Sequence, residues 1–223
     1  MKFPELRPRR LRYNNKIRQM VKETQLSIDN FIYPIFISEI IDKKQEIRSM
    51  PEIYQFDIDT AVQEAMEVET LGIPAVILFG IPEKKDPFGS SAYDSNGIIQ
   101  KTIRALKENT NLYIITDVCL CEYTDHGHCG IIKNNYVDND ETLKHIAKQA
   151  LSHVQAGADM VAPSCMMDGQ IKTMRETLDK NGYETTAIMS YASKFASKLY
   201  DPFFKHGTQS VVSFGDKKSY QME

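Results

Sequence analysis

The densest group of reactive side chains lies in residues 117–130, which read DVCLCEYTDHGHCG. Cys119, Cys121 and Cys129 fall within eleven residues. Thiolates are soft ligands that bind zinc strongly, and three of them leave a tetrahedral ion one open position for water or substrate. The spacing C-x-C-x7-C also differs from the paired C-x2-C knuckles of a structural finger. The segment therefore favours an open metal site, and the alternative is a chance cluster of inert, buried thiols.

Two histidines accompany the thiols. His128 is the better candidate for a residue that contacts a metal ligand without binding the metal itself. Either His126 or His128 could instead be a loop residue that is hydrogen-bonded to the backbone. Direct coordination of zinc by either imidazole is the less favoured alternative.

A second reactive feature is Lys194, in the run SYASKFASK that follows an apolar segment. A lysine at a strand end beside aromatic residues is a candidate Schiff-base former. Imine formation needs a neutral amine, and we expect an apolar wall and a nearby cation to lower the lysine pKa. An ordinary solvated lysine is the alternative, and a surface role is the default for Lys198.

A third polar segment is APSCMMDG, residues 162–169. Ser164 and Asp168 either cap the next helix or line a site, and capping is the simpler interpretation. Cys165 is too isolated in the sequence to be assigned to the metal.

These residues follow short apolar segments that alternate with amphipathic ones. We expect strands near 31–37, 75–79, 112–118, 160–162 and 186–191, and helices near 60–71, 141–156 and 170–181, each helix followed by glycine. The alternation favours parallel pairing and an α/β barrel whose functional residues gather at the carboxyl ends of its strands. A doubly wound sheet shares this rhythm, but no glycine-rich phosphate fingerprint follows the first strand.

The overall composition excludes several classes of protein. The 223 residues carry a formal net charge of −3, which gives no general attraction to nucleic acid or to acidic membranes. No stretch approaches the roughly 20 apolar residues of a membrane span, and no secretory signal begins the chain. Clustered cysteines do not form a secreted disulfide framework, so a cytoplasmic protein is expected. The basic residues between Arg7 and Arg18 form either a solvated arm or an arm that docks on another subunit.

Together these segments resemble the porphobilinogen synthase (5-aminolevulinate dehydratase) family, in its order and spacing. The motifs are DVCLCEYTDHGHCG, APSCMMDGQI, IMSYASKFAS and FGDKKSYQM, with RPRRLR, YPIF, SMP and GSSAYDSNGI. The resemblance covers the chain from Arg7 onward. It implies a (β/α)8 barrel, of which about the first five β/α units are expected here: an N-terminal arm at 1–25 and an incomplete barrel at 26–223.

The resemblance also implies a reaction and residue roles. Family members condense two molecules of 5-aminolevulinate into porphobilinogen with loss of two waters, in tetrapyrrole synthesis. Cys119, Cys121 and Cys129 match the zinc ligands, and Lys194 matches a Schiff-base lysine. Asp117 and Ser164 match active-site residues, and Tyr200 matches a pocket residue. Lys217 and Gln221 match a loop that closes over substrate, and Lys217 stands where the family holds a substrate carboxylate.

The sequence departs from the family at two places. The family usually reads Y-G-P-F-R, with an arginine that grips a substrate carboxylate, and here Phe204 occupies that position. A charge-assisted contact contributes about 1.5–3 kcal/mol, so we expect affinity to fall by about tenfold or more unless a slip lets Lys205 substitute. The family's second Schiff-base lysine, in a V-K-P motif, has no counterpart before Glu223. We therefore expect the 223-residue chain alone to be aggregation-prone and inactive.

Three functional hypotheses remain. The preferred one is this zinc and imine enzyme; the others are a metal-independent Schiff-base barrel such as an aldolase, and an inactive zinc-binding relic. The family also implies a homo-octamer in which the arm embraces a neighbouring subunit. In many members a magnesium lies at a subunit boundary, with ligands mostly beyond residue 223.

Overall fold

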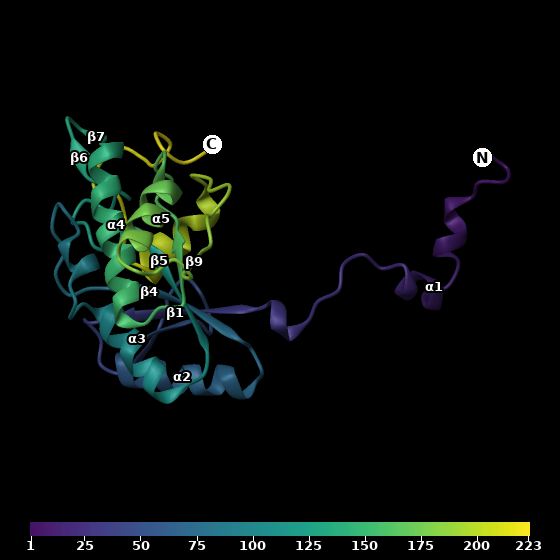
Figure 1. The fold of residues 1–223 in the computed structure, drawn as a ribbon, viewed down its shortest axis with the longest axis horizontal. Helices are drawn as coiled ribbons and strands as arrows, with labels where there is room; N and C mark the ends of the chain where they lie inside the picture. The colour runs from purple at the N-terminus through teal and green to yellow at the C-terminus, as the bar shows by residue number, and fades with distance from the viewer.

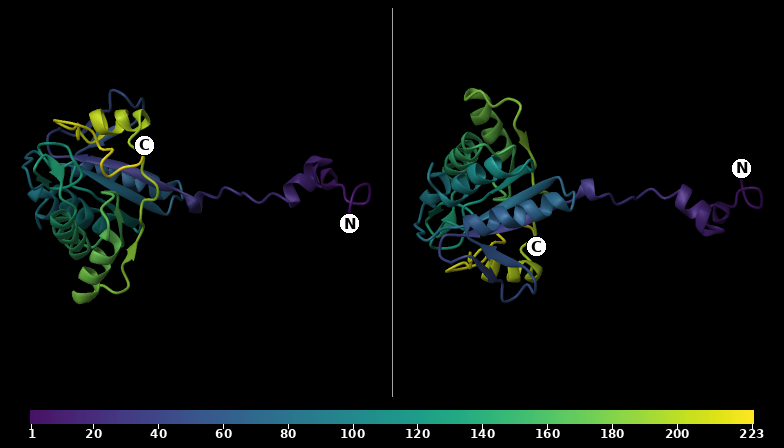
Figure 2. Two further views of the ribbon diagram at one scale, coloured as in Figure 1. Left: turned by 90° about the horizontal axis from the view of Figure 1, so that it is seen from above. Right: turned by 90° about the horizontal axis from the view of Figure 1, so that it is seen from below.

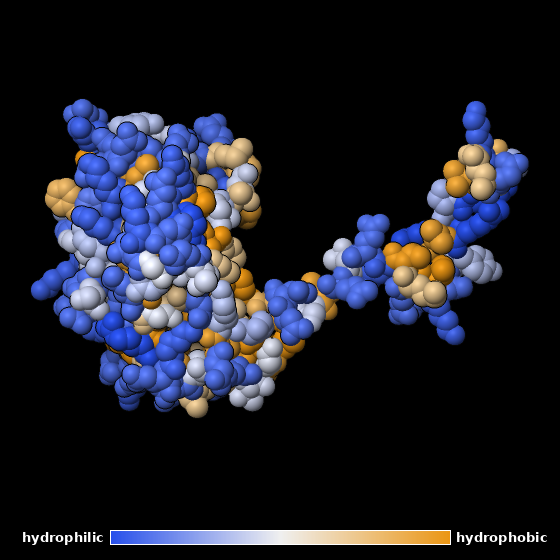
Figure 3. Space-filling view, viewed as in Figure 1, coloured by the Kyte–Doolittle hydropathy of each residue, from blue (hydrophilic) through white to orange (hydrophobic).

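The computed structural model describes residues 1–223, and its first thirty residues extend away from a single α/β body (Figure 1). This arm contains the 3-10 helix η1 (Pro8–Arg12), the short helix α1 (Asn15–Met20) and the 3-10 helix η2 (Ile28–Asn30), none with a buried residue. Several apolar side chains of the arm are exposed, and Figure 3 shows them as hydrophobic clusters on its surface.

The body is built on a seven-stranded sheet in the order β2-β3-β1-β4-β5-β8-β9. The parallel strands are β1 (Ile32–Ser38), β3 (Tyr54–Phe56), β4 (Ala75–Ile81), β5 (Tyr113–Val118), β8 (Met160–Pro163) and β9 (Ala187–Ile188), and β2 (Lys44–Glu46) runs antiparallel to β3. The predicted parallel α/β fold is confirmed. The sheet is open between β2 and β9, so it does not show a closed barrel.

Each of the five predicted strands is present, although β9 has only two residues. Strands β2 and β3 were not predicted, because each has only three residues and β2, with the sequence KQE, is fully exposed and has no apolar residue. A second, two-stranded sheet joins β6 (Ile132–Lys133) and β7 (Tyr136–Val137) as a hairpin in the loop after β5.

Four longer helices cover the sheet: α2 (Ile58–Thr70), α3 (Ile98–Asn109), α4 (Asn139–Ala156) and α5 (Gln170–Lys180). Asp57 and Asp138 cap α2 and α4 by accepting hydrogen bonds from backbone N–H groups of the first turn. Gly157 ends α4 with φ 112°, as the predicted left-handed cap requires. The amphipathic helix α3 was not predicted, because it ends at Thr110 without a glycine.

The two faces of the sheet pack against different parts of the chain. On β4, Val76 and Leu78 belong to the core formed with α2 and α3, whereas Ile77 and Phe79 face the other side, where Phe203 packs. Figure 2 shows the C-terminal segment, in yellow, on the opposite side of the sheet from α4 and α5. The carboxyl ends of the strands are therefore enclosed by segments far apart in sequence. No helix in the structure combines the length and hydropathy that crossing a bilayer requires.

A buried histidine on α4 gives the fold a pH dependence. His153 is fully buried beside Thr116, with 3.0 Å between Nδ1 and Oγ1, and burial lowers its pKa from 6.5 to about 3. Between these values the unfolded chain binds the proton and the folded one does not, so stability present above pH 6.5 is lost as pH falls toward 3. This term amounts to at most about 5 kcal/mol.

We expect a His153→Gln variant to lose stability less steeply than wild type between pH 6.5 and 4, as measured by urea unfolding at a series of pH values. Glutamine retains a polar group toward Thr116 but does not titrate. An unchanged slope in the variant would show that other groups control the acid sensitivity.

Candidate active site at the carboxyl ends of the strands

The three predicted metal ligands come together directly after β5. The Sγ atoms of Cys119, Cys121 and Cys129 all lie within 4.8 Å of one another, and those of Cys119 and Cys121 are 3.3 Å apart. All three are buried, free thiols. Hydrogen bonds from the other two thiols hold the pKa of Cys129 well below its ordinary value. Burial raises the pKa of Cys119, and hydrogen bonds with the other two thiols, followed by burial, raise that of Cys121. The cluster is thus able to hold a soft cation.

Both histidines support the loop, and the geometry gives neither a ligand role. The Nε2 atom of His128 lies 3.0 Å from the carbonyl oxygen of Phe214, and its Nδ1 lies 3.1 Å from the Tyr220 hydroxyl. His126 accepts a hydrogen bond from the backbone N–H of His128 at 3.1 Å, and its other ring nitrogen lies 3.3 Å from the Pro87 carbonyl oxygen. Since all four ring nitrogens have protein partners, the geometry favours a supporting role for both histidines over direct coordination.

Two buried carboxylates lie beside the thiols, and one of them was missed by the sequence reasoning. Asp117 is the next-to-last residue of β5, and Glu122 follows Cys121, whose thiol donates to Glu122 Oε2 at 3.3 Å. Asp117, Cys119 and Glu122 form a second compact group of potential ligands. Burial raises the pKa of both carboxyl groups, and Asp117 Oδ1 has no hydrogen-bond partner. An acidic residue inside a run of thiols was the only signal for Glu122.

Lys194 lies in the same buried region. It is 6% exposed, and its Nζ donates to the Ser164 carbonyl oxygen at 2.9 Å. The rings of Tyr191, Tyr200 and Phe204 surround the ammonium group, with centroids 5.7, 5.8 and 5.9 Å from Nζ. The structure therefore brings the predicted Schiff-base lysine, Ser164 and Tyr200 together under an aromatic wall.

The charge of this lysine differs from the expectation. Burial lowers the pKa of Lys194 as anticipated, but the negative charges of Cys129, Cys119 and Cys121 act in the opposite direction and raise the pKa well above its ordinary value. The neighbours that determine the protonation state are anions, whereas the sequence analysis anticipated a cation. A group that offsets the thiolate charge will therefore lower the pKa of the Lys194 amine.

The C-terminal segment completes the site. Met222 donates its N–H to the Lys194 carbonyl oxygen at 3.0 Å and accepts from the Ala196 N–H at 2.7 Å. Gln221 Nε2 lies 3.9 Å from the Cys129 sulfur. Lys217 is buried, its Nζ has no hydrogen-bond partner, and it lies 3.8 Å from the centroid of the Phe204 ring. The predicted loop residues Lys217 and Gln221 thus lie at the site. Phe204 stands at the position of the family's arginine and contacts the Lys217 ammonium.

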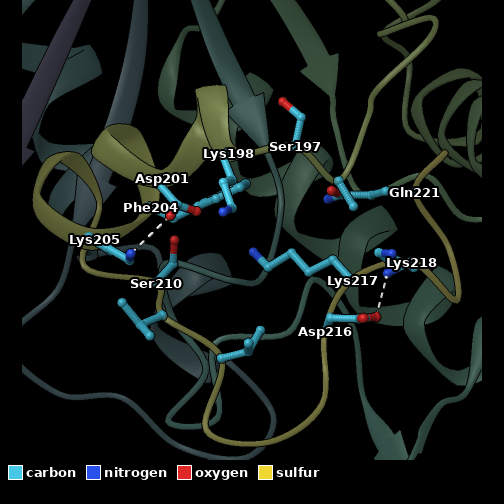
Figure 4. A pocket seen from close by; sticks show the side chains of 13 residues that line it. Ser197, Lys198, Asp201, Phe204, Lys205, Ser210, Asp216, Lys217, Lys218 and Gln221 are labelled. Atoms are coloured by element: carbon cyan, nitrogen blue, oxygen red, sulfur yellow. Dashed lines mark hydrogen bonds and ion pairs between the residues drawn. The ribbon is translucent and has the colours of Figure 1, made fainter. Parts of the chain in front are cut away.

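A cavity of about 260 Å³ opens next to this site. Its walls include Phe204, Lys217 and Gln221, and Figure 4 shows the Lys217 side chain reaching across it. Lys194, Asp117, Ser164, Tyr200 and the cysteines do not line it. The Phe204 ring contacts Lys217 closely and Lys194 more distantly, so it contributes to the boundary between the cavity and the amine. Lys205 is paired with Asp201 at 2.9 Å, so it does not substitute freely for the missing arginine.

Tyr220, also missed from the sequence, joins the C-terminal segment to the thiol loop. Its oxygen accepts from the Cys129 N–H at 3.3 Å and lies 3.1 Å from His128 Nδ1. Because His128 Nε2 donates to Phe214, the neutral ring has Nδ1 free to accept the tyrosine proton. The hydroxyl therefore satisfies a donor and an acceptor at once.

We expect Tyr220→Phe to cost about 1–3 kcal/mol of stability, because it leaves these buried groups unpaired, and to speed proteolysis within residues 208–223. Urea unfolding and limited proteolysis with mass spectrometry measure the two effects. Tyr136→Phe is the matched control, because that hydroxyl makes only an exposed contact with the Ser219 carbonyl oxygen at 3.4 Å. Equal effects of the two variants would contradict the assigned role.

Comparison with known proteins agrees with the family resemblance of the sequence motifs. A model of the family "Delta-aminolevulinic acid dehydratase" matches residues 5–223. The dehydratase of Methanothermus sociabilis is 56% identical over 223 residues, covering all of this chain and 69% of that protein. The dehydratase of Bacillus subtilis is 48% identical over 218 residues, covering 97% of this chain and 67% of that protein.

A solved structure agrees with these matches. The porphobilinogen synthase of Toxoplasma gondii, in complex with the reaction product porphobilinogen, superposes with a TM-score of 0.92 at 36% identity. The alignment covers 98% of this chain and 63% of that one. The chain therefore belongs to the delta-aminolevulinic acid dehydratase family, the porphobilinogen synthases, which are lyases of tetrapyrrole biosynthesis.

Proposed function

We propose that this chain carries the metal-binding and imine-forming part of a porphobilinogen synthase active site, for the condensation of two 5-aminolevulinate molecules with loss of two waters. The observation that carries the proposal is that Lys194 and the three-thiol cluster share one buried region beyond the ends of the parallel strands. The family match favours this function over an aldolase-like barrel or an inactive relic.

The donor set fits zinc. Three mutually close thiol sulfurs are soft ligands, and they leave one tetrahedral position for a substrate oxygen or water. Zinc bound by Cys119, Cys121 and Cys129 would supply Lewis-acid polarisation of a carbonyl or hydroxyl oxygen. Glu122 and Gln221 lie against the ligands and would fix their orientation.

Charge balance links this metal site to the lysine. A divalent cation held by Cys119, Cys121 and Cys129 would offset the thiolate charge that raises the Lys194 pKa, and burial, which lowers this pKa, would then have the larger remaining effect. The neutral amine attacks the substrate ketone and forms a Schiff base with loss of water. The Ser164 carbonyl oxygen, which accepts from Nζ, holds the amine in place before attack.

The other site residues have roles suited to their positions. Asp117 has a free, buried carboxyl oxygen and serves as a proton acceptor or donor near the amine. Lys217 binds a substrate carboxylate, Gln221 closes the C-terminal segment over the thiols, and Tyr200 forms part of the apolar wall.

We also propose that the extended arm at 1–25 packs against a neighbouring subunit of a homo-octamer in the cytoplasm, with residues 26–223 as barrel units. The exposed Phe3, Leu11 and Met20 give the arm apolar surface suited to such a contact. Magnesium at a subunit boundary remains an expectation from the family.

The first test is chemical trapping. We expect borohydride reduction of the zinc-loaded chain with 5-aminolevulinate to attach substrate irreversibly to Lys194, as located by peptide mass spectrometry. Lys194→Arg should abolish the adduct, and Lys205→Arg, which keeps the charge paired with Asp201, should retain it. Failure of the wild-type chain to form an adduct with zinc present would argue for the relic.

The second test concerns the metal. We expect Co²⁺, as an optical probe for zinc, to produce intense sulfur-to-metal charge-transfer absorption at one ion per chain. Cys129→Ser should weaken binding at least tenfold because it removes the thiolate that the cluster stabilises. Cys165→Ser is the matched control, since Cys165 is equally buried but outside the three-thiol group. Normal Co²⁺ spectra from the Cys129 variant would overturn the ligand assignment.

A further inference from the structure

The cavity beside Phe204 is lined by more cations than anions. Its walls carry Lys198, Lys205, Lys217 and Lys218 but only two acids, Asp201 and Asp216. Figure 4 shows these side chains around the space, with no other charged group among the lining residues. A small anion is therefore the chemical class of ligand that this cavity favours.

The four lysines are not equivalent. Lys205 is paired with Asp201 at 2.9 Å, and Lys218 is paired with Glu223 at 3.1 Å. Lys217 is buried without a hydrogen-bond partner. Lys198, the first residue of the 3-10 helix η4 (Lys198–Tyr200), makes no ion pair or side-chain hydrogen bond in the structure. Two ammonium groups on the cavity wall are thus free to receive a ligand.

We propose that Lys198 is a specificity-determining residue that binds the substrate carboxylate together with Lys217. This inference rests on the proposed function and assigns Lys198 the positive charge that Phe204 does not supply. Both lysines line the same cavity of about 260 Å³, a size suited to a short-chain acid.

The contacts of Phe204 explain why the positive charge for the carboxylate comes from another residue than the one at position 204. Its ring lies 3.8 Å from the Lys217 ammonium and 5.9 Å from that of Lys194. A cation–π contact holds Lys217 in the cavity without adding charge. An arginine there would place a third cation near two buried lysines, whereas Lys198 is an exposed residue of the cavity lining.

The backbone fixes Lys198 relative to the imine-forming amine. Only three residues separate it from Lys194, and that segment is hydrogen-bonded to Met222 at both Lys194 and Ala196. The Ser197 hydroxyl accepts from the Leu199 N–H at 3.3 Å and starts the η4 turn. A carboxylate held by Lys198 is therefore kept at a defined distance from Lys194.

The test compares levulinate, a keto acid, with its neutral methyl ester as substrates for borohydride trapping at Lys194 in the zinc-loaded full chain. The readout is the ratio of half-saturating concentrations. We expect wild type to favour the acid by tenfold or more, and Lys198→Gln to reduce this preference to threefold or less. Lys205→Gln, which removes a paired lysine from the same cavity, should retain the wild-type preference.

A double variant provides a rescue. Lys198→Gln with Phe204→Arg should recover most of the preference for the acid, because the guanidinium at position 204 supplies a carboxylate partner in the same cavity. Efficient trapping with an undiminished preference in Lys198→Gln would overturn the inference and leave the proposed function intact. An equal loss in Lys205→Gln would overturn it as well, since only general charge would then matter. Absence of any adduct with either compound would reject the proposed function and this inference together.

Discussion

The structure depends on the burial of several acidic groups at one point beyond the sheet. Three thiols and two carboxyl groups lie within a region that also contains Lys194 and Lys217, all removed from water. Burying an ionised group without a partner is costly, so the protonation of each group depends on its neighbours. This explains why the pKa of Cys129 is lowered while that of Asp117 is raised by burial and Glu122. A bound divalent cation and the two lysines together would bring the region close to neutrality.

The region is enclosed by chain segments that the sheet alone does not bring together. β5 and β8 supply the thiol loop and Ser164, with register Asp117↔Ala162 and Val118↔Pro163 placing these strand ends side by side. The segment after β9 supplies Lys194, and the last residues return to bond with it through Met222. Gln55, on β3, anchors the intervening helix η5 (Phe203–Gly207) by donating to the carbonyl oxygens of His206 and Gly207. The far edge of the sheet therefore helps to position the aromatic wall over Lys194.

Much of this could be predicted from the sequence because the strong signals are local. Continuous apolar runs predicted the strands β1, β4 and β5, and the thiol spacing predicted the cluster of Cys119, Cys121 and Cys129. The three-residue strands β2 and β3 carry no such run, and α3 lacks the glycine that marked the other helices. Glu122 was missed because its grouping with Asp117 and Cys119 depends on how the loop folds, and Tyr220 because it contacts Cys129 across 91 residues of sequence. The predicted direction of the Lys194 pKa shift was wrong for the same reason, because the shift depends on sulfurs that lie 65 or more positions away in the chain.

The Phe204 position shows how one substitution can redistribute recognition without disrupting a site. The ring packs against Phe203 and stacks on Tyr200, so it strengthens the apolar wall around Lys194. It also contacts the Lys217 ammonium in a cation–π interaction, which keeps this charge in place at the cavity. The lost arginine would have had to remain charged beside two buried lysines, and its removal lowers that repulsion in the ligand-free state. An exposed lysine of the cavity lining, Lys198, contributes positive charge there at a smaller desolvation cost than a buried arginine would.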